Sequence, residues 1–60
     1  MCESTVFKER GSKRDVLMDE VVHVAIEGGR LRLTGILGET RELEGRIKEI
    51  DLLKHAIIVV

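Results

Sequence analysis

Hydrophobic and polar residues alternate most clearly in two neighbouring runs, Val21 to Glu27 and Arg30 to Leu37. Alternation with a period of two is typical of a β-strand that buries one face. The two runs are separated by Gly28-Gly29, and a two-glycine loop favours the tight turns that join antiparallel strands. The pattern therefore predicts a β-hairpin at the centre of the chain.

This turn also predicts which residues face one another across the hairpin. One face becomes apolar, and a slip of one residue would expose that face to water, so the register is well specified. The pair beside the turn combines opposite charges, which favours the same register. The predicted pairs are Glu27–Arg30, Ile26–Leu31, Ala25–Arg32, Val24–Leu33 and His23–Thr34.

Glycines and polar breaks divide the rest of the chain into further short β-rich segments. The spacing of Ile47, Ile50 and Leu53 also suits a helix, but the β-branched ending Ile57 to Val60 favours strands. Asp19-Glu20 is expected to separate two strands. The fold class is therefore all-β, as a small antiparallel meander or partly closed barrel of six to seven short strands. The remaining predicted strands are Ser4 to Glu9, Arg14 to Met18, Thr40 to Leu43, Arg46 to Leu52 and Ala56 to Val60.

Three features of this small sheet predict a homodimer. A chain of 60 residues has a small core. The last predicted strand is apolar on both faces and needs cover on both sides. The free edges of a small sheet invite pairing with another chain. A two-fold homodimer would enlarge the core, cover the last strand and pair the free edges.

Length and composition limit the classes of protein to which the chain can belong. We expect a single β domain over residues 1–60 with a metal-binding amino terminus. No apolar run is long enough to span a membrane, and no secretory signal precedes the first strand. One reduced cysteine in an unsecreted chain fits the cytoplasm. No phosphate loop or catalytic serine motif is present, so we do not expect an enzyme.

Cys2 is the only cysteine, and it lies one residue from the amino terminus. Its thiolate, its backbone nitrogen and the terminal amine can reach one metal ion through adjacent chelate rings. Such N,S donors suit Ni(II) or Cu(II), which favour square-planar geometry. Glu3 is expected to shape the site through its backbone nitrogen. His23 and His55 have no ligand spacing between them and are expected to be surface residues.

A small RNA-binding β-barrel module is the first alternative function, and a purely structural dimerisation domain is the second. The candidate RNA-binding residues are the cations around the first predicted turn, Lys8, Arg10, Lys13 and Arg14. The net charge of −1 and the single aromatic residue, Phe7, argue against RNA binding, because nucleic-acid binders usually carry a basic excess and several stacking rings. Nucleic acid is thus an unlikely partner.

The chain resembles the CooT family of small nickel-binding proteins. The resemblance rests on the Met1-Cys2 start and on the order and spacing of the later segments. It implies a homodimer that binds one Ni(II) between two chains through Cys2 and assists nickel supply to carbon monoxide dehydrogenase. The wider group has also been labelled RNA-binding. The other matching features are the strand around Val6, Val21 to Glu27, the Gly28-Gly29 turn, Leu31 to Leu33, Gly45 and Ile50 to Leu52.

Overall fold

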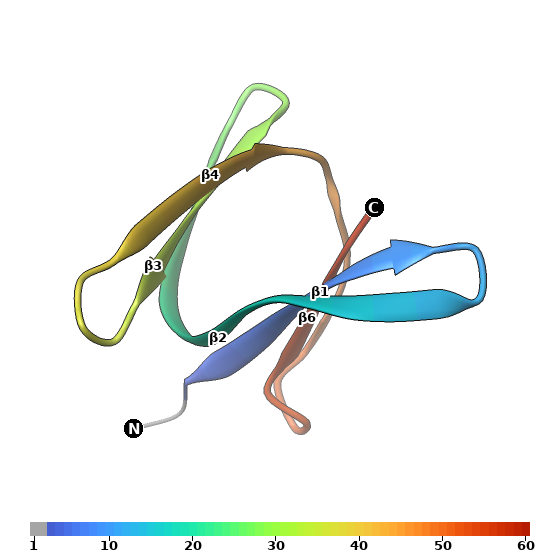
Figure 1. Cartoon of the computed structure of the whole chain (residues 1–60), viewed down its shortest axis with the longest axis horizontal. Helices are drawn as coiled ribbons and strands as arrows, with labels where there is room; N and C mark the ends of the chain where they lie inside the picture. Colours follow the sequence, from blue (N-terminus) through green and yellow to red (C-terminus); the bar gives the residue numbers. More distant parts are fainter. Residues whose placement is uncertain (1–2) are drawn as a thin grey trace.

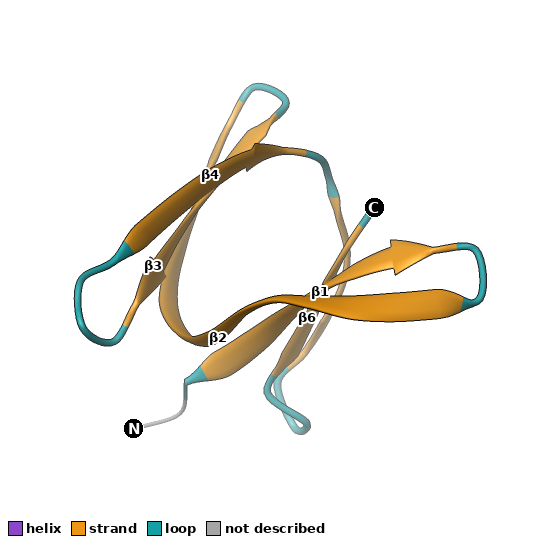
Figure 2. Ribbon diagram, viewed as in Figure 1, coloured by secondary structure: helices purple, strands orange, loops and turns teal. Residues whose placement is uncertain are grey.

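A computed structural model describes residues 3–60, which form one mixed β-sheet (Figure 1). The strands are β1 (Ser4–Arg10), β2 (Lys13–Glu27), β3 (Arg30–Gly35), β4 (Thr40–Glu44), β5 (Ile47–Asp51) and β6 (Ala56–Val59). Their order in the sheet is β4-β3-β2-β1-β6-β5. Turns and loops connect them (Figure 2). Nowhere in residues 3–60 is there a helix long and apolar enough to cross a membrane.

The predicted all-β class is confirmed, including strands for the ambiguous segment after Gly45. Of the six to seven strands expected, six form, because the predicted segments Arg14 to Met18 and Val21 to Glu27 are parts of one strand, β2. The expectation of a purely antiparallel sheet is wrong, because β1 and β6 pair in parallel from Thr5–Ala56 to Lys8–Val59. The sheet also does not close into a barrel, since β4 and β5 are its two outer strands.

The β2–β3 hairpin has the register that the Gly28-Gly29 turn predicts, from Glu27–Arg30 to His23–Thr34. Gly28 has a φ of 61°, a backbone conformation that glycine adopts without steric cost. The expected ion pair beside the turn is replaced by others. Arg30 reaches instead to the carboxylates of Glu42 and Glu44 on β4, at 3.6 and 3.7 Å.

The expected break at Asp19-Glu20 is an irregularity inside one strand. β2 runs through it for 15 residues, so that its first part pairs with β1 and its last part with β3. The register with β1 shifts between the Ser4–Val21 and Val6–Met18 pairs. Such bulges bend a strand, and here the bend lets one strand serve two parts of the sheet.

The corner between β4 and β5 brings the two ends of the sheet together. The amide nitrogen of Gly45 donates to the carbonyl of Gly29, and Arg46 and Val60 exchange backbone hydrogen bonds at 3.1 and 2.8 Å. A Cβ atom on Gly45 would lie 3.0 Å from a Val59 methyl and from the Val60 carbonyl, so a side chain here would force these neighbours to move.

The core lies inside the curled sheet and consists of Val6, Val21, Leu31, Leu33 and Val59. β6 lies between β1 and β5. Its residue Val59 is fully buried in this core, and Ile58, which points to the opposite face, is only 2% exposed. The chain itself therefore covers both faces of the last strand, and that reason for expecting a homodimer is wrong.

Candidate metal centre

The start of β1 is held from both sides of the strand. Ser4 pairs with Val21 of β2, and the Thr5 amide donates to the carbonyl of His55 at 2.9 Å. The Thr5 hydroxyl also donates to a carboxylate oxygen of Asp19 at 2.8 Å. The first two residues of the chain are therefore attached to a fixed point.

Asp19 and Glu20 link this point to the turn between β3 and β4. The same Asp19 oxygen accepts from the Glu20 amide at 2.9 Å, and the Glu20 carbonyl accepts from the Ile36 amide at 3.0 Å. Glu20 has a φ of 52°, which a non-glycine residue rarely adopts. The bulge thus joins the start of β1 to a turn that is distant in the sequence.

The turn between β5 and β6 lies on the other side of β1. The Asp51 carboxylate accepts from the Lys54 amide at 3.0 Å. His55 closes the turn with a φ of 54°, a conformation in which histidine is more frequent than most residues. Figure 1 shows the start of β1 between the β3–β4 and β5–β6 turns, along the lower side of the view.

We call this region the amino-terminal end and define it as residues 3–5, 19–22, 36–39 and 51–55. It is acidic, because it contains five carboxylates, and Lys54 is its only lysine or arginine. The five carboxylates are Glu3, Asp19, Glu20, Glu39 and Asp51.

The amino-terminal end is also apolar at its two turns. Leu53 is 90% exposed, Leu37 is 88% exposed and Leu52 is 77% exposed. Val22 and Ile36 are each 44% exposed. The sequence signal for this surface is the presence of leucines in turns, where polar residues are expected.

The predicted metal ligand Cys2 lies outside the described residues. Glu3 is half-buried and directly precedes β1. His23 is exposed on β2 opposite Thr34, and His55 is exposed at its turn. Within residues 3–60, no three His, Cys, Asp or Glu side chains are arranged to hold a metal ion.

The candidate RNA-binding cations come together on the β1–β2 hairpin. Its register places Lys8 opposite Asp15, Glu9 opposite Arg14, and Arg10 opposite Lys13. Arg14 donates to the Glu9 carboxylate at 3.0 Å, and Lys48 of β5 donates to its other oxygen. These two hydrogen bonds, first that from Lys48, lower the pKa of Glu9.

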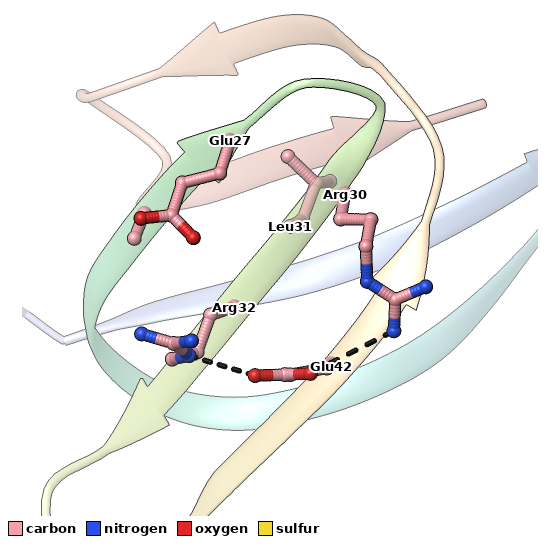
Figure 3. Close-up of a pocket in the computed structure, with 6 residues that line it drawn as sticks. Glu27, Arg30, Leu31, Arg32 and Glu42 are labelled. Carbon is pink, nitrogen blue, oxygen red and sulfur yellow. Dashed lines mark hydrogen bonds and ion pairs between the residues drawn. The ribbon is translucent and has the colours of Figure 1, made fainter.

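A shallow hollow of about 60 Å³ lies on the outer side of the β2–β3–β4 region (Figure 3). Glu42 lies there between Arg32, at 2.9 Å, and Arg30. The hydrogen bond and charge of Arg32 lower the pKa of Glu42. The hollow is far below the roughly 300–1,000 Å³ of typical ligand pockets, and its arginines already have carboxylate partners.

Comparison with known proteins identifies the family. A family model described as "CO dehydrogenase accessory protein CooT" matches residues 1–60. A crystal structure from Carboxydothermus hydrogenoformans that carries the CooT name superposes with a TM-score of 0.90 at 26% identity, over 97% of this chain and 94% of that one.

Two relatives from archaea are similar in sequence, and neither name assigns an activity. A protein of Methanothermobacter thermautotrophicus is 37% identical over 98% of this chain and 88% of its own length. A protein of Archaeoglobus fulgidus is 43% identical over 70% of this chain and 93% of its own length.

Proposed function

Because the chain belongs to the CooT family of CO dehydrogenase accessory proteins, we propose that it is a cytoplasmic nickel-binding protein that supplies Ni(II) and is not itself an enzyme. The observation that carries the proposal is the family match over residues 1–60, which includes Cys2. An accessory role in a system that uses nickel agrees with the N,S donors that the sequence places at the amino terminus.

Ni(II) is the cargo in this proposal, and Cys2 is its principal ligand. The thiolate binds the metal, and the terminal amine and the backbone nitrogens of Cys2 and Glu3 lie within reach of the same ion. Thiolate and nitrogen donors favour late transition metals over Mg²⁺ or Ca²⁺. The family's client system favours nickel over copper as the cargo.

The charge of the amino-terminal end supports this function. The segments of the amino-terminal end carry five carboxylates and one ammonium. Two of these segments, 19–22 and 51–55, contact the start of β1. A surface with one dominant sign of charge raises the local concentration of the opposite ion. The acidic end would thus attract Ni²⁺ toward the start of β1, which the hydrogen bonds of Thr5 fix in place.

The exposed leucines support a homodimer that shares one Ni(II). A small stable interface needs about 600 Å² from each chain. That is about one seventh of the 4315 Å² surface of this protein. Large exposed apolar side chains are typical of interaction sites where they gather on one surface. A two-fold axis beside Leu37 and Leu53 would bring two Cys2 residues near one another, so that each chain gives half of a four-coordinate site.

Nickel hand-over requires that the site open without unfolding the sheet. The proposed ligands precede β1, and the strand itself is fixed by Thr5 and by pairing with β2 and β6. Release of the ion then requires movement only of residues ahead of β1, and local opening of a segment costs less than unfolding the sheet. CO dehydrogenase is the proposed recipient.

A nickel titration of the untagged protein tests this function. The wild type should develop a thiolate-to-nickel charge-transfer absorption band, and Cys2→Ser should lose the band and the tight binding. His23→Gln and His55→Asn are matched controls that should keep both. An unchanged nickel affinity in Cys2→Ser would refute the proposal.

A further inference from the structure

The tip of the β1–β2 hairpin extends beyond the rest of the sheet (Figure 1). β6 pairs with β1 only as far as Lys8, and β3 pairs with β2 only from Val21 onward. Beyond Lys8 the hairpin is therefore two-stranded. We call residues 8–15 the arm, and residues 10–16 are all exposed. An isolated hairpin is only marginally stable in water, so its persistence here needs other contacts.

The arm differs in charge from the rest of the molecule. It carries four cationic and two anionic side chains, whereas the rest of the chain has six cationic and nine anionic ones. A small protein with this asymmetry is oriented by the electric field of a charged partner. The arm is thus the part of the protein that an acidic surface would attract.

We propose that the arm docks on an acidic surface of the recipient enzyme, with Lys8, Arg10 and Lys13 making the charged contacts. This inference rests on the proposed function for the identity of that enzyme. Arg14 is not among the three because it is bound to Glu9 together with Lys48. In residues 3–60, by contrast, Lys8, Arg10 and Lys13 form no ion pair.

The two ion pairs of Glu9, with Lys48 and with Arg14, fix the direction of the arm. Lys48 comes from β5, so its ion pair with Glu9 ties the arm to the outer strand on the other side of β6. Arg14 joins the two strands of the arm through the same carboxylate. A pre-organised arm loses less conformational freedom on binding, which favours docking.

An apolar spot lies at the base of the arm. Val16 is 60% exposed and faces Phe7, which in turn neighbours the buried Ile58. An apolar centre beside charged residues is the usual composition of a protein–protein interface. The arm therefore offers both kinds of contact to a protein surface.

The same arm fits a nucleic acid poorly. Glu9 and Asp15 alternate with the cations and would repel a phosphate backbone. Phe7 is half-buried within the sheet and does not present a free face for stacking bases. A protein surface of mixed charge can satisfy the carboxylates as well as the cations.

The position of the arm suits transfer of a metal. The tip of the arm and the start of β1 lie at opposite ends of this seven-residue strand. At about 3.3 Å per residue, this strand separates them by roughly 20 Å. Docking through the arm thus leaves the amino-terminal end uncovered and free to release its ion.

The test measures binding to nickel-free CO dehydrogenase from the same organism, at low and high NaCl. The arm variant is Arg10→Gln with Lys13→Gln, and the control is Arg30→Gln with Arg46→Gln, which removes equal charge elsewhere. We expect the arm variant to weaken binding about tenfold or more, the control less than about twofold, and NaCl to weaken the wild type. Equal loss in both variants would overturn the inference, as would a wild type that does not bind the enzyme.

Two further measurements separate this inference from the proposed function. The arm variant should keep the nickel affinity of the wild type, because its changes lie at the far end of β1. Nickel binding without docking would overturn only the inference that the arm docks on the enzyme. Docking through the arm without nickel binding would overturn only the proposed function. Tighter binding of a single-stranded RNA oligonucleotide than of the enzyme, lost in the arm variant, would reassign the arm to RNA.

Discussion

Asp19 shows how much of the candidate site depends on single side chains. Its carboxylate accepts from the Thr5 hydroxyl and from the Glu20 amide, and Glu20 in turn binds Ile36. One carboxylate therefore joins the start of β1, the bulge of β2 and the β3–β4 turn. The sequence marks Asp19-Glu20 as polar, but its partner Thr5 is 14 residues away, and no local pattern identifies that contact.

Removal of this carboxylate should loosen the amino-terminal end. Asp19→Ala leaves the Thr5 hydroxyl and the Glu20 amide without their acceptor, so we expect the free energy of unfolding to fall by about 1–2 kcal/mol in urea titrations. Asp15→Ala, at an exposed position on the arm, is the control and should change it by less than about 0.5 kcal/mol. Equal losses of unfolding free energy in the two variants would show that the Asp19 hydrogen bonds do not stabilise the fold.

Glu9 should make stability depend on pH. Because Lys48 and Arg14 lower its pKa in the folded state, the ionised carboxylate stabilises the fold above its ordinary pKa. That stabilisation is lost as the pH falls through the lowered value. Glu9→Gln should therefore reduce the Tm at pH 7, and the difference from the wild type should shrink at pH 3. Circular dichroism measures both Tm values. A Tm difference that stays constant from pH 7 to pH 3 would contradict the stabilising role of the ionised Glu9.

At the scale of elements, the central hairpin could be predicted to the residue and the sheet order could not. A two-residue glycine turn fixes the register of β2 and β3 locally. The parallel pairing of β1 with β6 joins the two ends of the chain and has no turn signature. The acidic and apolar amino-terminal end depends on that pairing, so the sequence predicts Cys2 and Glu3 but not their surroundings.

The corner at Gly45 should tolerate no side chain. In Gly45→Ala the new Cβ would press on Val59 and on the Val60 carbonyl, so we expect a loss of about 1–3 kcal/mol in the free energy of unfolding. Gly29→Ala is the matched control, because nothing lies within 4 Å of its Cβ position. Chemical denaturation of both variants checks this, and equal losses would mean that the corner is not sterically constrained.

At the scale of the whole molecule, charge and apolar surface are separated. The amino-terminal end combines carboxylates with exposed leucines, and the arm at the other end of β1 is basic. The proposed function assigns the first region to nickel and to a second copy of the chain. The further inference assigns the arm to the recipient enzyme.

The proposed dimer should depend on the turn leucines. Leu53→Asp would place like charges near the two-fold axis, and we expect sedimentation velocity to show a monomer at micromolar concentration. Ile26→Asp, which changes an exposed residue beside the Gly28-Gly29 turn, should remain a dimer. Both positions are more than half exposed, so neither variant should unfold the chain. A wild type that sediments only as a monomer would contradict the dimer.

Native mass spectrometry of the untagged, nickel-loaded protein tests the central claim most directly, since it counts chains and metal ions together. We expect a dimer that carries one Ni(II), and no Ni(II) on the Cys2→Ser protein. One Ni(II) on each monomer, or nickel retained by Cys2→Ser, would contradict it.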